Sequence, residues 1–152
     1  MKIVDFLKPE LIIENIQAQD KPGMLREFAK HIEKTRGIKA EKVFNVLMER
    51  EKLGSTGIGK GVAIPHGKLH DLKEFICCFG KSEKGIDFEA IDGNPVHLVF
   101  LLLAPENSAG THLKALAKIS KILKDPNFRE QLLKTQGVDE IYRIIKEEDD
   151  KL

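Results

Sequence analysis

Apolar residues follow helical spacing at both ends of the chain and gather into short runs in its middle. A β-prone run over 11–18 comes first. Apolar residues three and four positions apart then predict helices over 24–35 and 40–52. Gly37 and Gly54 follow these segments, and a glycine after the last periodic residue is a helix stop signal. The first third of the chain is therefore expected to be mainly helical.

Three short apolar runs in the middle of the chain predict β-strands. They cover 62–64, 75–80 and 96–104, and Asp92-Gly93 between the last two is a turn signal. The run over 96–104 is almost continuously apolar, so both of its faces should be buried. A strand of this kind is typical of a sheet that helices cover on both sides.

Helical spacing returns from residue 111 onward and predicts three further helices. Thr111 is expected to cap the first, and Asp125, followed by Pro126, the second. Gly137 separates the second helix from the third, and the charged tail over 146–152 is expected to fray. The residues expected to face inward are Leu113, Leu116, Ala117, Ser120 and Leu123 in the first helix, Leu132 and Leu133 in the second, and Ile141, Ile144 and Ile145 in the third.

This order of helices, strands and helices predicts an α/β fold, a three-layer α/β/α sandwich with a mixed β-sheet. The 152 residues fit a single domain over 1–152, and a chain of this length can bury a substantial core.

Charge and composition argue against nucleic acid or a membrane as the partner. Lys plus Arg total 25 and Asp plus Glu total 24, so the net charge is only +1. The longest apolar run, 98–105, is too short to cross a bilayer, and the N-terminus lacks the apolar segment of a signal peptide. The two cysteines, Cys77 and Cys78, are adjacent and make no disulfide framework, which favours a reducing, cytoplasmic setting.

The glycine-rich stretch GSTGIGKGVAIPHG, residues 54–67, invites comparison with a nucleotide-binding loop. It matches the P-loop pattern up to Lys60, but Gly61 stands where a Ser or Thr hydroxyl would bind magnesium. The stretch follows a predicted helix and leads into a strand, the reverse of the P-loop order. The dinucleotide-binding pattern fails as well, because Val62 occupies the third glycine position. An ATP-using enzyme is therefore disfavoured.

The histidines do not form a convincing metal site. His66 and His70 have helical i, i+4 spacing, but the proline and glycine around His66 oppose a helix there. The adjacent cysteines would point to opposite faces of a strand, and we expect them to be small apolar strand residues. His70 and His31 are expected at or near the surface, and His97 in a hydrogen-bonded or edge position of its strand.

His66 differs from the other histidines because Pro65 and Gly67 flank it at the end of an expected strand. We expect the glycine to leave the imidazole open to a large partner. A neutral imidazole is a competent nucleophile near neutral pH, and its attack on a phosphoryl group would give a phosphohistidine. Arg50 suits contact with phosphate, and His112, at the expected start of a helix, could contact an anion. The chemistry alone leaves open whether Arg50 and His112 are instead a surface arginine and a capping-region histidine.

Two long blocks of the sequence resemble one family. They are EREKLGSTGIGKGVAIPHGKL and IDFEAIDGNPVHLVFLLLAPENSAGTHLKALAKIS. Both are similar to the phosphotransferase-system (PTS) enzyme IIA family of the fructose/mannitol type, also called EIIA type-2. The likeness extends from the first predicted helix to Ile144, and within the family it is strongest to the nitrogen-regulatory IIA proteins. The fold that the resemblance implies is an α/β/α sandwich with a mixed sheet.

The resemblance also implies the roles of individual residues. His66 matches the phosphorylated histidine of the IPHG motif, Arg50 the arginine that contacts the phosphoryl group, and His112 the second active-site histidine. Ser55 and Thr56 lie in the matching loop and are expected to help through their hydroxyl groups or backbone N–H groups. No cofactor and no metal are expected.

The partners that the resemblance implies are proteins. The histidine-containing phosphocarrier protein, or its nitrogen-branch paralogue, would donate the phosphoryl group to His66. The chain would then act as a regulator whose phosphorylation state selects its partner, or as a relay to a separate fructose/mannitol-type IIB domain. The absence of a IIB or membrane segment from the chain favours the regulator slightly.

Overall fold

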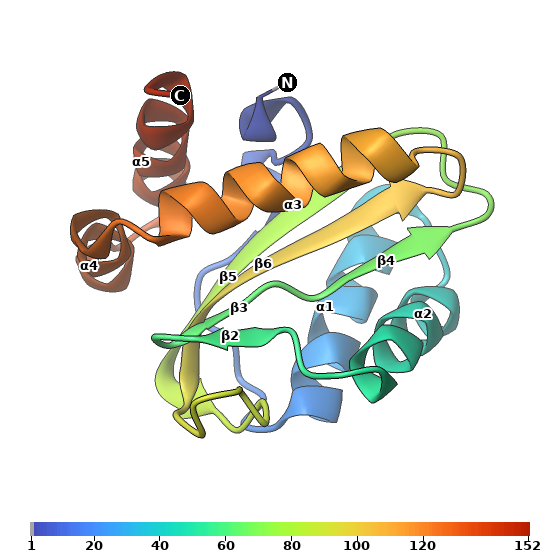
Figure 1. Cartoon of the computed structure of the whole chain (residues 1–152), viewed down its shortest axis with the longest axis horizontal. Helices are drawn as coiled ribbons and strands as arrows, with labels where there is room; N and C mark the ends of the chain where they lie inside the picture. Colours follow the sequence, from blue (N-terminus) through green and yellow to red (C-terminus); the bar gives the residue numbers. More distant parts are fainter. Residues whose placement is uncertain (1) are drawn as a thin grey trace.

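The computed structural model describes residues 2–152, which form helices packed around one β-sheet (Figure 1). The helices are η1 (Ile3–Asp5) and η2 (Pro9–Leu11), both 3₁₀, and α1 (Lys21–Arg36), α2 (Ala40–Lys52), α3 (Ala109–Leu123), α4 (Pro126–Lys134) and α5 (Val138–Asp150). The strands are β1 (Ile12–Ile13), β2 (Gly57–Gly59), β3 (Val62–Ala63), β4 (His66–Leu69), β5 (Ile76–Ile86) and β6 (Val96–Pro105).

The sheet is mixed, and β6 is its central strand. The strand order is β1-β5-β6-β3-β2, and β4 also pairs with β6. β5 runs antiparallel to β6, whereas β3 and then β4 run parallel to it along the same edge. The register pairs His66 with Leu102, so the first residue of β4 is fixed beside the most buried part of β6.

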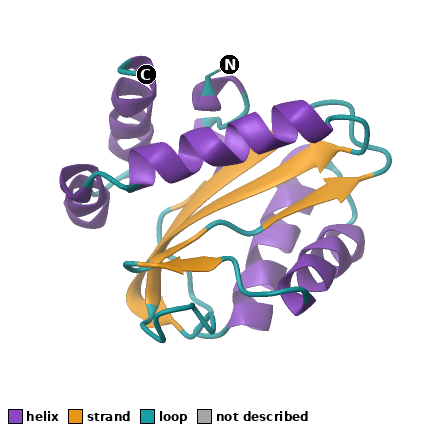
Figure 2. Cartoon of the chain, in the orientation of Figure 1, coloured by secondary structure: helices purple, strands orange, loops and turns teal. Residues whose placement is uncertain are grey.

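Helices cover both faces of the sheet, which confirms the predicted sandwich. α3 crosses one face, whereas α1 and α2 lie on the opposite side (Figures 1 and 2). Residues 98–104 of β6 are buried on both faces, as the continuous apolar run predicted. Cys77 and Cys78 are free thiols buried in β5, as expected for small apolar strand residues.

Several local predictions are confirmed by the backbone. α2 has the predicted bounds, and Gly37 ends α1 in the left-handed conformation with φ of 74°. Asp125 caps α4 by accepting a hydrogen bond from the Asn127 N–H at 2.9 Å. His97 lies on β6, where its Nδ1 is 2.8 Å from the Ser82 carbonyl oxygen.

The predicted start of α3 was wrong, and its predicted inward face was only partly right. Leu123 is buried as expected, and Leu116 packs against the core. Ser108, not Thr111, precedes the helix, and Leu113 is 66% exposed. The buried residues are His112, Ala115, Ile119, Ile122 and Leu123. This segment carries two apolar stripes, and the one that packs on the sheet contains the β-branched residues Ile119 and Ile122. In α4, Leu132 is buried as predicted but Leu133 is exposed, because adjacent helical residues point in different directions.

The charged tail does not fray, contrary to expectation. It continues α5 to Asp150, and the Asp149 side chain is fully buried. One Asp149 carboxylate oxygen lies 2.9 Å from Lys118 Nζ of α3, and the other accepts the Val4 N–H at 3.1 Å. A buried carboxylate that is paired and hydrogen-bonded in this way links α5 to α3 and η1.

The sequence pattern also missed β2 and β4. Both contain glycine, and β4 has the sequence HGKL, which lacks the apolar alternation of a typical strand. β4 forms because its backbone pairs with β6, a long-range contact that its own residues do not encode.

We predict that Asp149→Ala lowers the free energy of unfolding by about 3 kcal/mol, because the variant removes a buried carboxylate that pairs with Lys118 and accepts the Val4 N–H. Urea unfolding followed by circular dichroism measures the change. Asp150→Ala is the matched control, since its carboxylate makes ion pairs with Lys2 and Lys146 at the surface. Equal losses for the two variants would show that the buried carboxylate has no special part in holding the tail.

Candidate functional site

Arg50, His66 and His112 meet at one cavity, although they are distant in the sequence. They come from the last turn of α2, the first residue of β4 and the first turns of α3, and Figure 1 shows β4 between these two helices. Arg50 Nε lies 3.2 Å from His66 Nε2, and the two imidazole ring centres are 5.4 Å apart. The three residues line a cavity of about 540 Å³ that is open to solvent.

The His66 ring is oriented by its own backbone. Its Nδ1 lies 2.9 Å from the Ile64 carbonyl oxygen, which can only accept a hydrogen bond. Nδ1 therefore carries the proton and donates it, and Nε2 of the neutral ring keeps its lone pair. That lone pair accepts the Arg50 Nε–H and faces the cavity. Of the two ring nitrogens, Nε2 is therefore the one that has a lone pair.

Both imidazoles are kept neutral by their surroundings. Burial lowers the pKa of His66 from its ordinary 6.5, and the Arg50 charge acts in the same direction, although the Ile64 carbonyl and Glu51 oppose it. Burial also lowers the pKa of His112, with further contributions from His66 and Lys68. A histidine that is neutral at neutral pH is available as a nucleophile.

Arg50 is held in place by the turn that ends α2. Its Nη1 donates to the Gly54 carbonyl oxygen at 2.9 Å, while Nε points at His66. Gly54 has φ of 145°, a conformation that side chains rarely adopt, so glycine is required to shape this turn. Guanidinium donors that these two bonds do not use remain for an incoming anion.

The hydroxyl groups of Ser55 and Thr56 are engaged away from His66. Ser55 Oγ donates to the Phe88 carbonyl oxygen at 3.1 Å and accepts the Gly57 N–H. The Thr56 hydroxyl donates to the buried Glu51 carboxylate. Neither residue lines the cavity. The structure therefore brings three of the five candidate residues together and places the other two behind them.

The sequence analysis missed an apolar and basic rim around the cavity. Leu53, Leu113 and Leu116 line it, and the first two are 85% and 66% exposed. Lys68 follows His66 by two positions in β4, so both side chains lie on the same face of the strand. The two-residue spacing from His66 could have identified Lys68, whereas Leu113 and Leu116 were expected to face inward because of their helical spacing.

The other two histidines weighed as metal ligands or surface residues lie away from this cavity. His70 is exposed at the end of β4, and its Nδ1 is 2.5 Å from Glu106 Oε2. His31 is half-buried on α1, with Nε2 2.7 Å from the Glu10 carbonyl oxygen. Residues 2–152 contain no cluster of three or more potential metal ligands among His, Cys, Asp and Glu.

Comparison with known proteins identifies the family. The sequence model described as the phosphoenolpyruvate-dependent sugar phosphotransferase system, EIIA 2, matches residues 5–148. The chain belongs to this family. It is 43% identical over 145 residues to a nitrogen regulatory protein of Bradyrhizobium diazoefficiens, with 95% of each chain covered.

Two further relatives place the chain within the EIIA type-2 family. The crystal structure of the nitrogen regulatory protein IIA-Ntr from Neisseria meningitidis has a TM-score of 0.89 and 35% identity, with 94% of this chain and 98% of that chain covered. The fructose-specific EIIABC component of Bacillus subtilis is 36% identical over 150 residues, which are 98% of this chain but 24% of that protein. The chain is thus an EIIA domain of a family of phosphotransfer proteins.

Gly67 of this EIIA domain lines the cavity beside His66, and it also packs closely against α2. A Cβ at this position would collide with Val46 Cγ1. Such a contact is far inside van der Waals distance, so only glycine lets α2 approach β4 this closely. Val46 and Arg50 lie one turn apart on α2, and the contact therefore sets the distance between Arg50 and His66.

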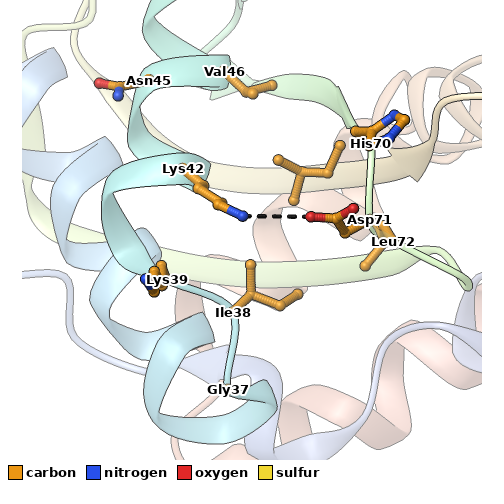
Figure 3. A pocket seen from close by; sticks show the side chains of 10 residues that line it. Gly37, Ile38, Lys39, Lys42, Asn45, Val46, His70, Asp71 and Leu72 are labelled. Carbon is orange, nitrogen blue, oxygen red and sulfur yellow. Dashed lines mark hydrogen bonds and ion pairs between the residues drawn. The ribbon is translucent and has the colours of Figure 1, made fainter.

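A second cavity, of about 750 Å³, lies between the start of α2 and the turn after β4 (Figure 3). Lys42 Nζ and Asp71 Oδ2 approach to 3.4 Å across it, above Ile38 and Leu72. This cavity shares Val46 with the His66 cavity but contains none of the three candidate site residues. Arg50, His66 and His112 all belong to the smaller cavity.

We predict that Gly67→Ala lowers the free energy of unfolding by about 2 kcal/mol, because the added methyl group forces β4 and α2 apart. Adding Val46→Ala removes the clash, so the double variant should be more stable than Gly67→Ala alone. Thermal unfolding of the parent, both single variants and the double variant measures the coupling. A Gly67→Ala protein as stable as the parent would contradict the packing role of this glycine.

Proposed function

We propose that His66 Nε2 accepts a phosphoryl group from the histidine-containing phosphocarrier protein, or from its nitrogen-branch paralogue, and holds it as phosphohistidine. The observation that carries the proposal is the placement of a neutral, correctly oriented imidazole between a fixed backbone carbonyl and the Arg50 guanidinium. Phosphoryl transfer requires mainly positioning and positive charge, and this arrangement offers both.

In the proposed step, the Nε2 lone pair attacks the phosphorus atom of the donor's phosphohistidine. A P–N bond forms at His66 as the P–N bond of the donor breaks, and the departing electron pair returns to the donor's imidazole. The Nδ1 proton of His66 stays on its hydrogen bond to Ile64 throughout. No cofactor or metal takes part in this balance.

Arg50 and His112 are proposed to stabilise the transferring oxygens. The Arg50 donors that do not bind Gly54 can turn from the His66 nitrogen to the phosphoryl group. His112 Nδ1 is buried and, among the described residues, has no hydrogen-bond partner. A proton on Nδ1 would be a buried donor without an acceptor, which costs free energy, so the neutral ring carries its proton on Nε2. Nε2 can then donate a hydrogen bond to a phosphoryl oxygen. Ser55 and Thr56 would act indirectly, through the loop that they stabilise.

The rim of the cavity supports a protein donor. Leu53 and Leu113 expose large apolar side chains on either side of His66, and such residues favour contact with a protein surface. Lys68 adds positive charge beside them, which suits a phosphorylated partner. A partner that covers these residues would also exclude water from the reacting atoms.

We propose that this EIIA domain acts chiefly as a nitrogen-regulatory protein, whose phosphorylation changes which protein it binds. The nitrogen regulatory relative is 43% identical to this chain, compared with 36% for the fructose-specific relative. A phosphoryl dianion placed between exposed leucines would alter docking through charge and desolvation. The alternative is a sugar-specific relay to a separate IIB domain.

A cytoplasmic setting is part of the same proposal. The two free cysteines suit a reducing compartment. Within residues 2–152, the helices are too short or too polar to span a bilayer.

Incubation with labelled phosphoenolpyruvate, enzyme I and the phosphocarrier protein tests the phosphoryl acceptor. We expect acid-labile label on the parent protein and none on His66→Ala, because the variant lacks the nucleophile. His31→Ala is the matched control and should label fully, since its imidazole lies on α1 away from the cavity. Full labelling of His66→Ala would show that another residue is the acceptor.

The same assay with His112→Ala separates acceptance from onward transfer. We expect partial labelling, because Nε2 of His66 and Arg50 remain, but slower loss of label to a IIB acceptor or back to the phosphocarrier protein. Chase kinetics measure the second step. A chase rate equal to that of the parent would remove His112 from the mechanism.

A further inference from the structure

A buried carboxylate lies directly behind the candidate site. Glu51 follows Arg50 in the last turn of α2, and its side chain is 2% exposed. One oxygen accepts the Thr56 backbone N–H at 3.0 Å, and the other accepts the Thr56 hydroxyl. Lys21 Nζ of α1 lies 3.2 Å from the first oxygen. A charged side chain is seldom buried unless it is paired and hydrogen-bonded, as Glu51 is here.

A chain of hydrogen bonds leads from Glu51 to the His66 ring. Glu51 binds Thr56, and the Thr56 carbonyl oxygen accepts the Ile64 N–H at 3.0 Å. The Ile64 carbonyl oxygen in turn accepts the His66 Nδ1 proton at 2.9 Å. The carbonyl that sets the tautomer of His66 therefore belongs to a residue whose own N–H is fixed by Thr56.

A second connection runs through the same loop to Arg50. The loop over 53–56 includes Gly54, whose carbonyl oxygen binds Arg50 Nη1 at 2.9 Å. Fixing Thr56 to Glu51 closes this loop over the end of α2, so the Gly54 carbonyl is held as well. Both partners of the contact between Arg50 and His66 thus depend on one buried carboxylate.

We propose that Glu51 is a positioning residue for phosphoryl transfer, which acts through Thr56 to hold His66 with its proton on Nδ1 and to hold Arg50 against Nε2. Lys21 provides the counter-charge that allows the carboxylate to stay buried. Lys21 is itself fixed 5.0 Å from the centre of the Phe88 ring and 3.2 Å from Glu89. The loop over 88–89 is thereby tied to the same network.

The electrostatics support a role at the site as well as in the fold. The Arg50 charge lowers the pKa of His66, whereas the Glu51 charge raises it, so Glu51 offsets part of the effect of its neighbour. If Glu51 served stability alone, replacing it would leave the tautomer and the pKa of His66 unchanged in any variant that still folds. The tautomer and the pKa of His66 therefore distinguish a positioning role of Glu51 from a purely structural one.

The experiment compares Thr56→Val, Thr56→Ser and Glu51→Gln with the parent. Thr56→Val keeps the shape of the side chain but removes the hydroxyl donor, and Thr56→Ser restores it. Glu41→Gln is the control, because its carboxylate lies on the same helix in an exposed ion pair with Arg26. Nitrogen NMR of isotopically labelled protein measures the tautomer and the pKa of His66, and a separate assay measures the rate of label transfer from the phosphocarrier protein.

We expect Thr56→Val and Glu51→Gln to reduce the Nδ1–H tautomer of His66, to lower its pKa further and to slow transfer by roughly tenfold to a hundredfold. Thr56→Ser should recover most of the rate, and Glu41→Gln should match the parent. A Thr56→Val protein with the parent's tautomer, pKa and rate would overturn the proposal even if Glu51→Gln fails to fold. Lower stability with an unchanged His66 ring would also overturn it, since the role would then be structural only.

The measurement of the transfer rate rests on the proposed function, whereas the NMR measurement of the His66 ring does not. If the parent protein takes no label, the proposed function fails while the tautomer measurement still decides the role of Glu51. If the parent labels normally and the variants label equally fast, the proposed function stands and the positioning role is wrong.

Discussion

The hydrogen bond from His66 Nδ1 to the Ile64 carbonyl oxygen is the contact on which the rest of the site depends. It assigns the proton to one ring nitrogen and so leaves the lone pair of the other facing Arg50 and the cavity. The bond forms within three residues, across Pro65, whose ring restricts the backbone. A short, rigid segment therefore holds the imidazole in one orientation.

The fold serves this contact by bringing three helices and an edge of the sheet to the same point. Pairing of β4 with β6 fixes the position of His66, and the close approach of Val46 to Gly67 places α2, with Arg50, beside it. α3 contributes His112 from its first turns because it crosses the opposite face of the sheet. The Lys21–Glu51–Thr56 contacts tie the start of α1 to the loop behind the site.

The periodicity of the sequence predicted the layered fold and the central strand, and the family resemblance implied the three residues that meet at the cavity. The sequence failed where long-range contacts decide the outcome. The buried Asp149 could not be distinguished from its charged neighbours in the tail, and the two apolar stripes of α3 could not be ranked without knowing what each would face. Thr56 was expected to help through its hydroxyl or its backbone N–H, and in the structure both groups bind Glu51.

The central claim is that the acceptor atom is Nε2 of His66, because the Ile64 carbonyl oxygen holds the proton on Nδ1. Nitrogen and phosphorus NMR of the isotopically labelled, phosphorylated protein tests this claim most directly. The account predicts that the phosphorus atom couples to Nε2 of His66 and that Nδ1 remains protonated. Coupling to Nδ1, or to any other histidine, would contradict it.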